Sequence, residues 1–223
     1  MHAMPQSMGI HVQGPPHCSS LGRQRLLTTI EQTATIITVD RGEQLGSRAR
    51  DDLFCRVEAG ALAECAICPS GRRQIVDLVL PRHCIIPSRR PDFYREAIAD
   101  RTHVSCFPRC RLESLADSDP RVARMLRDIG RAAVSRLQNQ LLVLGQTTAQ
   151  KKVGAFIFQL SGGLAVGPTG MLSLPLSRHD IADYLGISVE TVCRAFTDLQ
   201  RRHAIEMAGA RQVRIINLPN LEE

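Results

Sequence analysis

The chain has 223 residues, a formal net charge of +6 and a pI of about 9.1. Hydrophobic residues make up 43% of it and charged residues 22%, which is typical of a folded protein of one or two domains and not of a disordered chain. Only 4% of the residues are aromatic and Trp is absent, which argues against nucleic-acid binding by stacking of bases on aromatic side chains.

The chain begins with a stretch rich in Pro, Gly, Gln and His, and we interpret residues 1–24 as a flexible tail. This stretch contains no apolar segment of the kind found in a signal peptide, and no run of 18 or more apolar residues elsewhere could span a membrane. We therefore expect a cytoplasmic protein that has no membrane partner. Its eight cysteines are expected to stay reduced there, so disulfides are not predicted.

Residues 25–118 predict an antiparallel β-roll or barrel. Pro69-Ser70-Gly71 is a hairpin signal between two of the β-forming runs. Runs this short, divided by turn signals, favour an antiparallel arrangement that closes on itself. The predicted strands are 36–39, 53–57, 61–67, 73–80 and 102–107.

Residues 119–145 predict one long helix. Asp119-Pro120 is a helix start, and apolar residues then recur at steps of three or four along roughly 37 Å of helix. This stripe could pack on its own domain or form the seam of a two-fold dimer. We favour a homodimer, because a monomer that exposes so long a stripe would be unusual. The stripe consists of Val122, Leu126, Ile129, Ala133, Leu137, Leu141 and Leu144.

Residues 146–223 are predicted to be the DNA-binding domain. Thr147 or Thr148 can cap a helix over residues 151–160, and a hairpin-like connector follows over residues 164–174. From residue 145 on, 8 Lys and Arg stand against 7 Asp and Glu, a net charge of +1. Charge therefore does not identify the DNA-binding segment, and the assignment depends on the sequence pattern.

Residues 177–200 have the spacing of a helix-turn-helix. Ser177 can cap the first helix, with Asp180 near its positive end. Gly186 suits the turn because it adopts the left-handed backbone conformation without a Cβ clash. The second helix is predicted to follow the cap Ser188 and to run for about thirteen residues. A small residue, a glycine and an aliphatic residue are spaced as this motif requires: Ala182, Gly186 and Val192.

The second helix of such a motif lies in the major groove, with its first residues at the base edges. Arg194 can donate two hydrogen bonds to a guanine, and Glu190 can accept one from a cytosine amino group. An alternative stays open, because a Glu and an Arg four positions apart are often only a surface ion pair. The predicted base-reading residues are Val189, Glu190, Cys193 and Arg194, and the predicted phosphate contacts are Ser177, Arg178, Ser188 and Thr191.

The order of roll, long helix and C-terminal winged helix resembles the Crp/Fnr transcription regulators. The segment LPLSRHDIADYLGISVETVCRAFTDLQRRHAI is similar to the FixK branch of this family, as are GRRQIVDLVLP (71–81) and TTAQKKVGAFIFQL (147–160). The similarity extends from about residue 30 to residue 218. It implies an α+β fold with an N-terminal antiparallel β-roll of the cyclic-nucleotide-binding type, a dimerisation helix and a C-terminal winged helix-turn-helix.

The resemblance also implies a function. Members with a Val-Glu-x-x-Ser-Arg core read TTGA half-sites that are separated by six bases from an inverted TCAA partner. In this chain Cys193 stands in place of the Ser, which leaves discrimination at one base open. The family implies a homodimer that binds double-stranded DNA and activates transcription through RNA polymerase, in circuits for low oxygen, nitrogen fixation or denitrification.

No cofactor is predicted. Arg82-His83 stand where cyclic-nucleotide-binding relatives have a Gly-Glu pair, so cyclic AMP is not expected. Only Cys18 lies in the first 50 residues, whereas an iron–sulfur cluster needs four thiolates. Cys65 and Cys68 should point to opposite faces of a strand, and a metal site completed by His83-Cys84 does not fit the usual ligand spacing. Small buried hydrophobic roles are predicted for Cys55, Cys84, Cys106 and Cys110.

Cys193 is a candidate redox switch, because it lies early in a helix beside Arg194 and on the face that would meet DNA. The simpler interpretation is that Cys only replaces Ser. The competing function is a thiol- or metal-based redox sensor whose helix-turn-helix contacts proteins. An enzyme is not predicted, since Ser177, His179 and Asp180 are too close along one helix to form a catalytic triad, and no HExxH or phosphate-binding glycine loop occurs.

Overall fold

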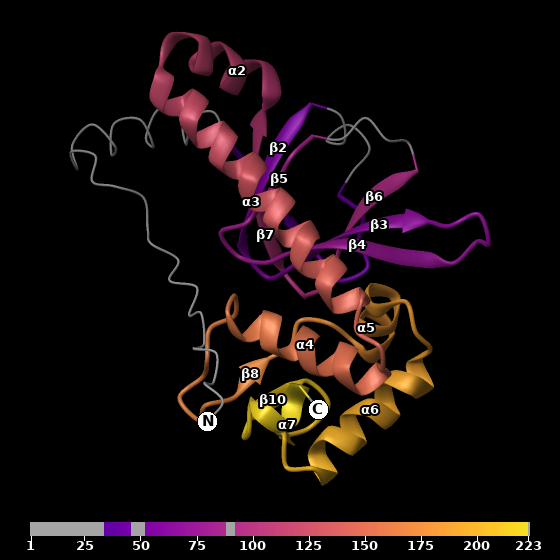
Figure 1. The fold of residues 1–223 in the computed structure, drawn as a ribbon. Coiled ribbons are helices and arrows are strands. Elements are labelled where there is room, and N and C mark those ends of the chain that lie inside the picture. The colour runs from indigo at the N-terminus through magenta and orange to yellow at the C-terminus, as the bar shows by residue number, and fades with distance from the viewer. Residues whose placement is uncertain (1–33, 46–51, 88–91, 223) are drawn as a thin grey trace, which may run out of the picture. The chain divides into compact units, whose positions relative to one another are not determined.

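The computed structural model describes residues 34–45, 52–87 and 92–222 (Figure 1). The predicted tail over residues 1–24 lies outside these ranges. The described chain begins with strands and ends with helices and a small sheet. Its first seven strands are β1 (Thr35–Val39), β2 (Leu53–Ala59), β3 (Leu62–Ile67), β4 (Arg73–Val79), β5 (Cys84–Ile85), β6 (Phe93–Ala97) and β7 (Thr102–Pro108).

The seven strands form two antiparallel sheets with the orders β1-β7-β2-β5 and β4-β3-β6. All five predicted strands are present, with ends that differ by one or two residues. The side chains that point inward from both sheets make one apolar core, as expected when strands alternate between an inner and an outer face. This arrangement confirms the predicted roll. The core consists of Val39, Leu45, Cys55, Val57, Leu62, Val79, Ile85, Ala97, Val104 and Cys106.

Two helices follow the roll, and the sequence predicted only the second. Helix α2 (Arg109–Ser118) begins directly after Pro108, which supplies no side-chain cap. Helix α3 (Pro120–Leu144) begins where its start signal predicts, because the Asp119 carboxylate accepts a hydrogen bond of 2.8 Å from the Arg121 amide. The missing cap explains why α2 has no start signal in the sequence.

One face of α3 packs on the roll. Arg136 forms a two-pronged ion pair with Asp77 of β4, at 2.8 and 3.2 Å, and also donates to the Cys84 carbonyl. Gln140 is buried and donates to the Ile75 carbonyl at 3.1 Å. Of the predicted apolar stripe, only Leu137 and Leu141 are exposed, whereas Val122 is buried and Leu126, Ile129, Ala133 and Leu144 are half-buried. The large exposed apolar side chains of α3 are Val134, Leu137, Leu141 and Leu142.

The C-terminal part of the described chain contains four helices and a three-stranded sheet of order β8-β10-β9. The sheet is the wing of a winged helix-turn-helix. A second core runs without a break from β3 and β4 through α4 into the helix-turn-helix, so this unit packs directly on the roll. No helix in the described ranges is long and apolar enough to cross a membrane. The elements are α4 (Ala149–Ser161), β8 (Leu172–Ser173), α5 (Arg178–Leu185), α6 (Val189–Arg201), β9 (Ile205–Met207), β10 (Gln212–Ile215) and α7 (Pro219–Glu222).

Candidate DNA-binding surface

The start of α5 is fixed by a reciprocal pair of side-chain caps. The Ser177 hydroxyl accepts from the Asp180 amide at 3.1 Å, and the Asp180 carboxylate accepts from the Ser177 amide at 2.9 Å. This capping box satisfies two backbone donors that the helix itself leaves free. Gly186 ends α5 with φ +66°, in the left-handed conformation that the turn was predicted to need. The first helix of the motif is therefore held firmly at both ends.

Helix α6 has one buried and one exposed face. Its inner face consists of Val192, Ala195, Phe196 and Leu199. Three of the four predicted base-reading side chains, Glu190, Cys193 and Arg194, are exposed on the opposite face, and Val189 is half-buried beside them. The helix begins after Ser188, whose hydroxyl accepts from the Thr191 amide at 3.2 Å. The first two turns of α6 thus present their polar side chains to solvent.

Glu190 and Arg194 do not form the surface ion pair that was the simpler alternative. Within the part of the chain that the structure describes, Arg194 instead donates to the Thr191 hydroxyl at 3.4 Å. The pKa of the exposed Glu190 carboxyl is lowered, chiefly by its own backbone N–H and then by the Ser188 hydroxyl. Glu190 is therefore a carboxylate, which can accept hydrogen bonds but cannot donate them. The positive charge of Arg194 also helps to lower the pKa of Glu190, but the two side chains form no direct salt bridge within the described residues.

The predicted phosphate-contacting residues have different roles in the structure: the serines cap helices, and the arginine stacks on an aromatic ring. The Ser177 and Ser188 hydroxyls serve as helix caps, and the Ser188 hydroxyl also lies 2.9 Å from the Thr191 hydroxyl. The Arg178 guanidinium stacks 3.4 Å above the Phe196 ring, where burial lowers the pKa of the arginine. One of its terminal nitrogens is buried without a hydrogen-bond partner among the described residues. Arg178 therefore packs between α5 and α6, which its sequence position alone does not show.

Three residues of the roll and its loops contact the first helix of the helix-turn-helix or the residues just before it, and the sequence did not predict these contacts. Arg73 of β4 lies 3.1 Å from Asp180 and 2.7 Å from Asp183, and it also approaches Glu96 at 3.4 Å. Arg41 donates to the Pro175 carbonyl at 3.1 Å, just before α5. Gln74 of β4 adds a hydrogen bond to the backbone of α5. Partners more than 100 positions apart leave no local sequence signal, so only the fold reveals this cluster.

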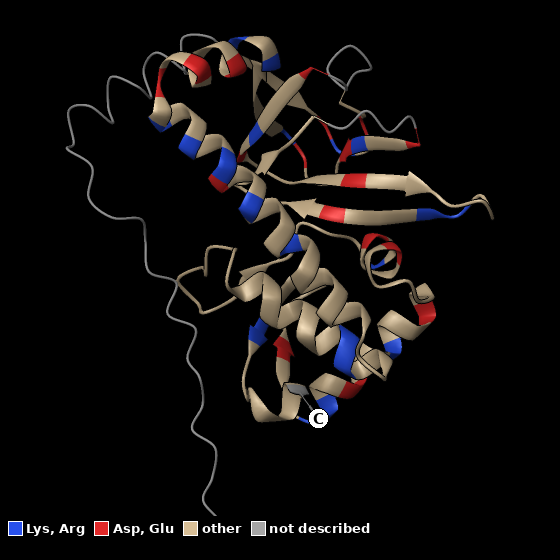
Figure 2. Cartoon of the chain, turned by 45° about the horizontal axis from the view of Figure 1, so that its top comes forward, with Lys and Arg blue, Asp and Glu red and all other residues tan. Residues whose placement is uncertain are grey.

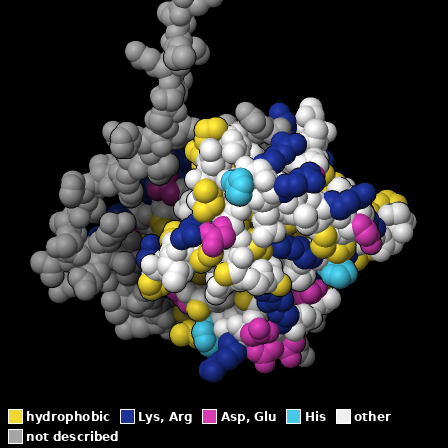
Figure 3. Space-filling view, turned by 90° about the horizontal axis from the view of Figure 1, so that it is seen from below, with side chains coloured by type: hydrophobic (Ala, Val, Ile, Leu, Met, Phe, Trp, Pro, Cys, Tyr) yellow, Lys and Arg dark blue, Asp and Glu magenta, His cyan; other side chains and the backbone are white. Residues whose placement is uncertain are grey.

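Charge is spread unevenly over the molecule. Arginines recur along α3, which accounts for part of the excess positive charge of the first 144 residues (Figure 2). The face that includes the C-terminal unit carries many Lys and Arg side chains with acidic ones between them (Figure 3). Exposed Arg194, Arg202 and Arg211 belong to this unit. A surface of this kind can attract a polyanion even though the unit has little net charge.

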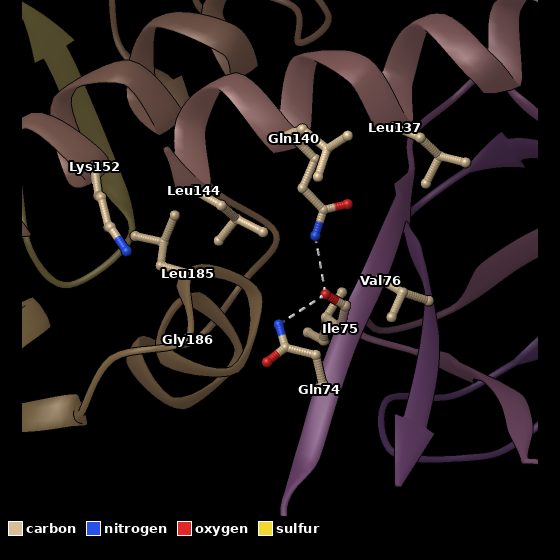
Figure 4. A pocket seen from close by; sticks show the side chains of 10 residues that line it. Gln74, Ile75, Val76, Leu137, Gln140, Leu144, Lys152, Leu185 and Gly186 are labelled. Atoms are coloured by element: carbon tan, nitrogen blue, oxygen red, sulfur yellow. Dashed lines mark hydrogen bonds between the residues drawn. The ribbon is translucent and has the colours of Figure 1, made fainter. Parts of the chain in front are cut away.

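A hollow of about 550 Å³ lies between β4, the end of α3 and the turn of the helix-turn-helix. Gln74 and Gln140 both donate to the Ile75 carbonyl at its edge (Figure 4). Leu137 and Leu141, which belong to the exposed stripe of α3, line the hollow as well. The apolar surface of α3 therefore continues into a concave apolar surface.

The cysteines are only partly placed as predicted. Cys55 and Cys106 are buried, as expected, whereas Cys84 is half-buried and Cys110 is exposed, so those two predictions are wrong. Cys110 lies in the unpredicted helix α2, on its solvent side, which explains the error. Cys65 is buried and Cys68 half-buried. Among the residues that the structure describes, no group of three or more His, Cys, Asp and Glu side chains could hold a metal ion.

Comparison with known proteins agrees with this architecture. Residues 120–223 match a family model described as a Crp-like helix-turn-helix domain. The nitrogen fixation regulation protein FixK of Rhizobium meliloti is 31% identical over 216 residues, which cover 96% of this chain and 92% of that protein. The transcriptional activatory protein AadR of Rhodopseudomonas palustris is 37% identical over 141 residues, 61% of this chain and 59% of its own. FixK2 from Bradyrhizobium japonicum has a similar structure, with a TM-score of 0.74, 34% identity and coverage of 84% of this chain and 95% of its own.

A winged helix-turn-helix that follows a β-roll and a long helix, with polar side chains exposed on its second helix, defines a DNA-binding transcription regulator and not an enzyme. The similarity to FixK over nearly the whole length of both chains makes the assignment specific. The chain belongs to the Crp/Fnr family of transcription regulators, in its FixK-like branch.

Proposed function

We propose that this protein is a homodimeric regulator that reads a palindrome of the type TTGA, six bases, TCAA. The observation that carries the proposal is the exposed pair Glu190 and Arg194 near the start of α6. A carboxylate can accept from the cytosine amino group, and a guanidinium can donate twice to guanine. Both bases occur in each half-site, on opposite strands. Val189 and Cys193 complete the base-reading set, and their apolar or weakly polar surfaces suit a thymine methyl group.

The dimer is supported by the exposed apolar face of α3. Leu141 is 68% exposed, Val134 54% and Leu137 45%, although all three are large apolar side chains on one helix. Exposure of such a face to water is unfavourable, and covering it with a partner lowers the free energy by about 25 cal/mol per Å² of apolar surface. A second α3 related by two-fold symmetry covers this face and the neighbouring hollow. Two copies of α6 then reach half-sites whose centres lie about 10 bp apart, on one side of the duplex.

The phosphate contacts are proposed at the ends of the two helices. The amides at the start of α5 and α6 lie next to Ser177, Ser188 and Thr191 and carry the positive end of each helix dipole. Arg178 contributes its charge from its place against Phe196, without extending far into solvent. These contacts position the protein on the duplex and add no sequence preference.

We further propose that the protein activates transcription through RNA polymerase, in a circuit for low oxygen, nitrogen fixation or denitrification. The support is similarity: relatives are named nitrogen fixation regulation protein FixK and transcriptional activator protein FnrL. The proposal includes no cyclic AMP and no iron–sulfur cluster. At the place of the Gly-Glu pair, Arg82 takes a left-handed conformation with φ +72°, and the His83 ring accepts from the Leu80 amide, so both residues serve a tight turn.

Cys193 is proposed as a redox-sensitive position of the reading face. Its side chain is exposed and interacts electrostatically with the Arg178 guanidinium, and Arg194 is its neighbour in the sequence. Oxidation to a sulfenic or sulfinic acid adds bulk and polarity where a base edge must fit. A Cys193→Ser variant that binds DNA normally and loses its sensitivity to peroxide supports this role. A variant that stays as sensitive as the parent protein removes it.

The proposed function is tested by selecting bound duplexes from a random pool with the purified full-length protein. The expected result is enrichment of a two-fold symmetric TTGA and TCAA motif with a six-base spacer, bound by a dimer. The same selection with an Arg194→Ala variant should lose its guanine preference. Recovery of sequences without symmetry, or of no preferred sequence, contradicts the proposal. Analytical ultracentrifugation of the free protein separates a failure of dimerisation from a failure of base reading.

A further inference from the structure

Two cysteines face each other across the central strands of the larger roll sheet. Cys55 of β2 and Cys106 of β7 are directly opposite in the antiparallel ladder. Their Sγ atoms are 3.6 Å apart, with one thiol directed at the other sulfur. Both side chains belong to the roll core, with exposures of 0% and 3%. The two residues are 51 positions apart in the sequence, so only strand pairing brings them together.

The backbone already has the spacing that a disulfide requires. Directly opposite residues of an antiparallel pair have Cα atoms about 4.5 or 5.5 Å apart. Disulfides join Cα atoms that are about 4.4 to 6.8 Å apart, with a sulfur–sulfur bond of about 2.05 Å. Rotation of the two side chains can therefore close most of the gap between the sulfur atoms. No strand has to leave its place in the sheet.

A buried cation faces the pair from the opposite sheet. Arg95 of β6 is 4% exposed, donates to Glu64 and to the Ile86 carbonyl, and retains one terminal nitrogen that has no hydrogen-bond partner in the described part of the chain. The hydrogen bond from Cys55 lowers the pKa of the Cys106 thiol, burial opposes this shift, and Arg95 assists it. The pKa of Cys55 is raised, chiefly because its proton is shared with Cys106. Cys106 is therefore the thiol of the pair that ionises more readily, with Cys55 as its hydrogen-bond partner.

We propose that Cys55 and Cys106 form a redox-active dithiol inside the roll, which a hydroperoxide oxidises to a reversible intramolecular disulfide. This site lies apart from the DNA-reading surface, and the proposal goes beyond DNA recognition. The sequence predicted that both cysteines serve only as small buried hydrophobic residues. The proposed redox role differs from that prediction and depends on the contact between their sulfur atoms. The Arg95 cation stabilises a thiolate at this place, and its terminal nitrogen that has no partner among the described residues can donate to the peroxide.

The reaction proceeds in two steps. The Cys106 sulfur attacks one oxygen of the hydroperoxide, the O–O bond breaks, and the other oxygen leaves and takes up a proton as water or alcohol. Cys106 is then a sulfenic acid. The Cys55 sulfur attacks the Cys106 sulfur, the S–O bond breaks, and the hydroxide leaves with the Cys55 proton as water. The two thiols together lose two electrons and the peroxide gains them. A dithiol reductant reverses the change by thiol–disulfide exchange.

The disulfide would join the two central strands of the sheet, just before β7 leads through Pro108 into α2 and α3. A crosslink over such a long loop restricts the unfolded chain and raises stability. We therefore expect the oxidised protein to unfold at a higher temperature than the reduced protein. The change acts on the roll and not on the exposed face of α6.

The test uses full-length protein in which the exposed thiols Cys110 and Cys193 are replaced by Ser, so that oxidation of the DNA face cannot interfere. After treatment with hydrogen peroxide under native conditions, remaining thiols are alkylated and the protein is digested. The expected result is a linked peptide pair that contains Cys55 and Cys106, removed by dithiothreitol, together with a higher Tm. A Cys55→Ala variant should lose the linked pair and instead accumulate a sulfenic acid at Cys106, detected with dimedone.

Several results overturn the proposal. Oxidation that links other cysteines, such as Cys84 or Cys65, would show that the ladder does not direct the reaction. A Cys55–Cys106 link that forms only in denaturant would show that the folded roll excludes the chemistry. The mapping is performed on a protein with the pair intact, so the result stands even if the Cys55→Ala variant folds poorly. Because the DNA-facing cysteine is absent, the outcome is independent of whether Cys193 senses oxidants.

Discussion

Removal of the Arg194 side chain should weaken specific DNA binding and leave the fold intact. Arg194 is exposed, and its hydrogen bond to the Thr191 hydroxyl is long, at 3.4 Å. It has no salt bridge among the described residues, so no buried charge is left behind in Arg194→Ala. The expected change in unfolding free energy is therefore within about 0.5 kcal/mol, as for other surface substitutions. The whole effect should appear in binding.

The magnitude follows from one bidentate contact in each half-site. Such a contact contributes about 1–3 kcal/mol of discrimination against the wrong base. A symmetric dimer carries the substitution twice, so the cost on the palindrome is about 2–6 kcal/mol. At about 1.4 kcal/mol per factor of ten, affinity falls by roughly 30-fold to more than 10⁴-fold. On a duplex with the guanine replaced, the same variant should lose much less.

Fluorescence anisotropy with labelled duplexes measures both numbers, at a fixed salt concentration because phosphate contacts depend on salt. Arg202→Ala is the matched control: Arg202 is an exposed arginine that caps the far end of the same helix. It should change affinity for all duplexes by a similar, small factor. The reasoning fails if Arg194→Ala weakens specific and scrambled duplexes equally, since the side chain then contacts only the phosphate backbone. It fails also if Arg202→Ala alone removes the sequence preference.

Three further changes test the surroundings of this surface. Leu141→Glu puts a charge on the exposed apolar face of α3 and should convert the dimer to a monomer, as measured by analytical ultracentrifugation. Ser135→Glu changes an exposed polar position of the same helix and should leave the dimer intact. Arg136→Met leaves the Asp77 carboxylate buried without its cation and should lower the free energy of unfolding, measured in urea, by about 3–5 kcal/mol. The double variant Arg136→Met with Asp77→Leu should recover most of this loss. An equal loss in the single and double variants would refute a buried ion pair. Burial lowers the pKa of His83, which must be neutral to accept from a backbone amide, so stability present above pH 6.5 should decline as the pH falls below that value. A His83→Asn variant should show a smaller decline over the same pH range, and an identical decline would assign the titration to other groups.

The sequence predicted those elements whose residues carry a local signal. The start of α3 at Asp119-Pro120 and the capping box of α5 lie where the pattern placed them, because caps and fixed φ angles are decided by neighbours in the chain. The helix-turn-helix could be predicted for the same reason, whereas its wing was implied only by the resemblance to the Crp/Fnr family. Helix α2 was missed because Pro108 supplies no cap, and β5 was missed because two residues are too few to show a period.

The sequence predicted which residues form the candidate site, but not the tertiary contacts that hold them in place. The exposed positions of Glu190 and Arg194 follow from the 3.6-residue period of α6, which also buries Val192 and Phe196. The stacking of Arg178 on Phe196 depends on how α5 crosses α6, which no local pattern encodes. Likewise, no local pattern pairs Cys55 with Cys106, because their contact follows from the register of two strands.

The low net charge of the DNA-binding domain is explained by where its acidic residues lie. Asp180 and Asp183 are paired with Arg73, Asp198 with Arg201, and Glu206 with Arg214. Among the acidic side chains that the structure describes from residue 145 on, this leaves Glu190, which stands on the reading face. Arg194, Arg202 and Arg211 of this unit are exposed and have no salt bridge among the described residues, so their full charge can attract DNA phosphates. Since the roll supplies Arg73, it neutralises carboxylates beside the reading helix that would otherwise repel DNA, and loss of Arg73 should weaken binding to every duplex sequence alike.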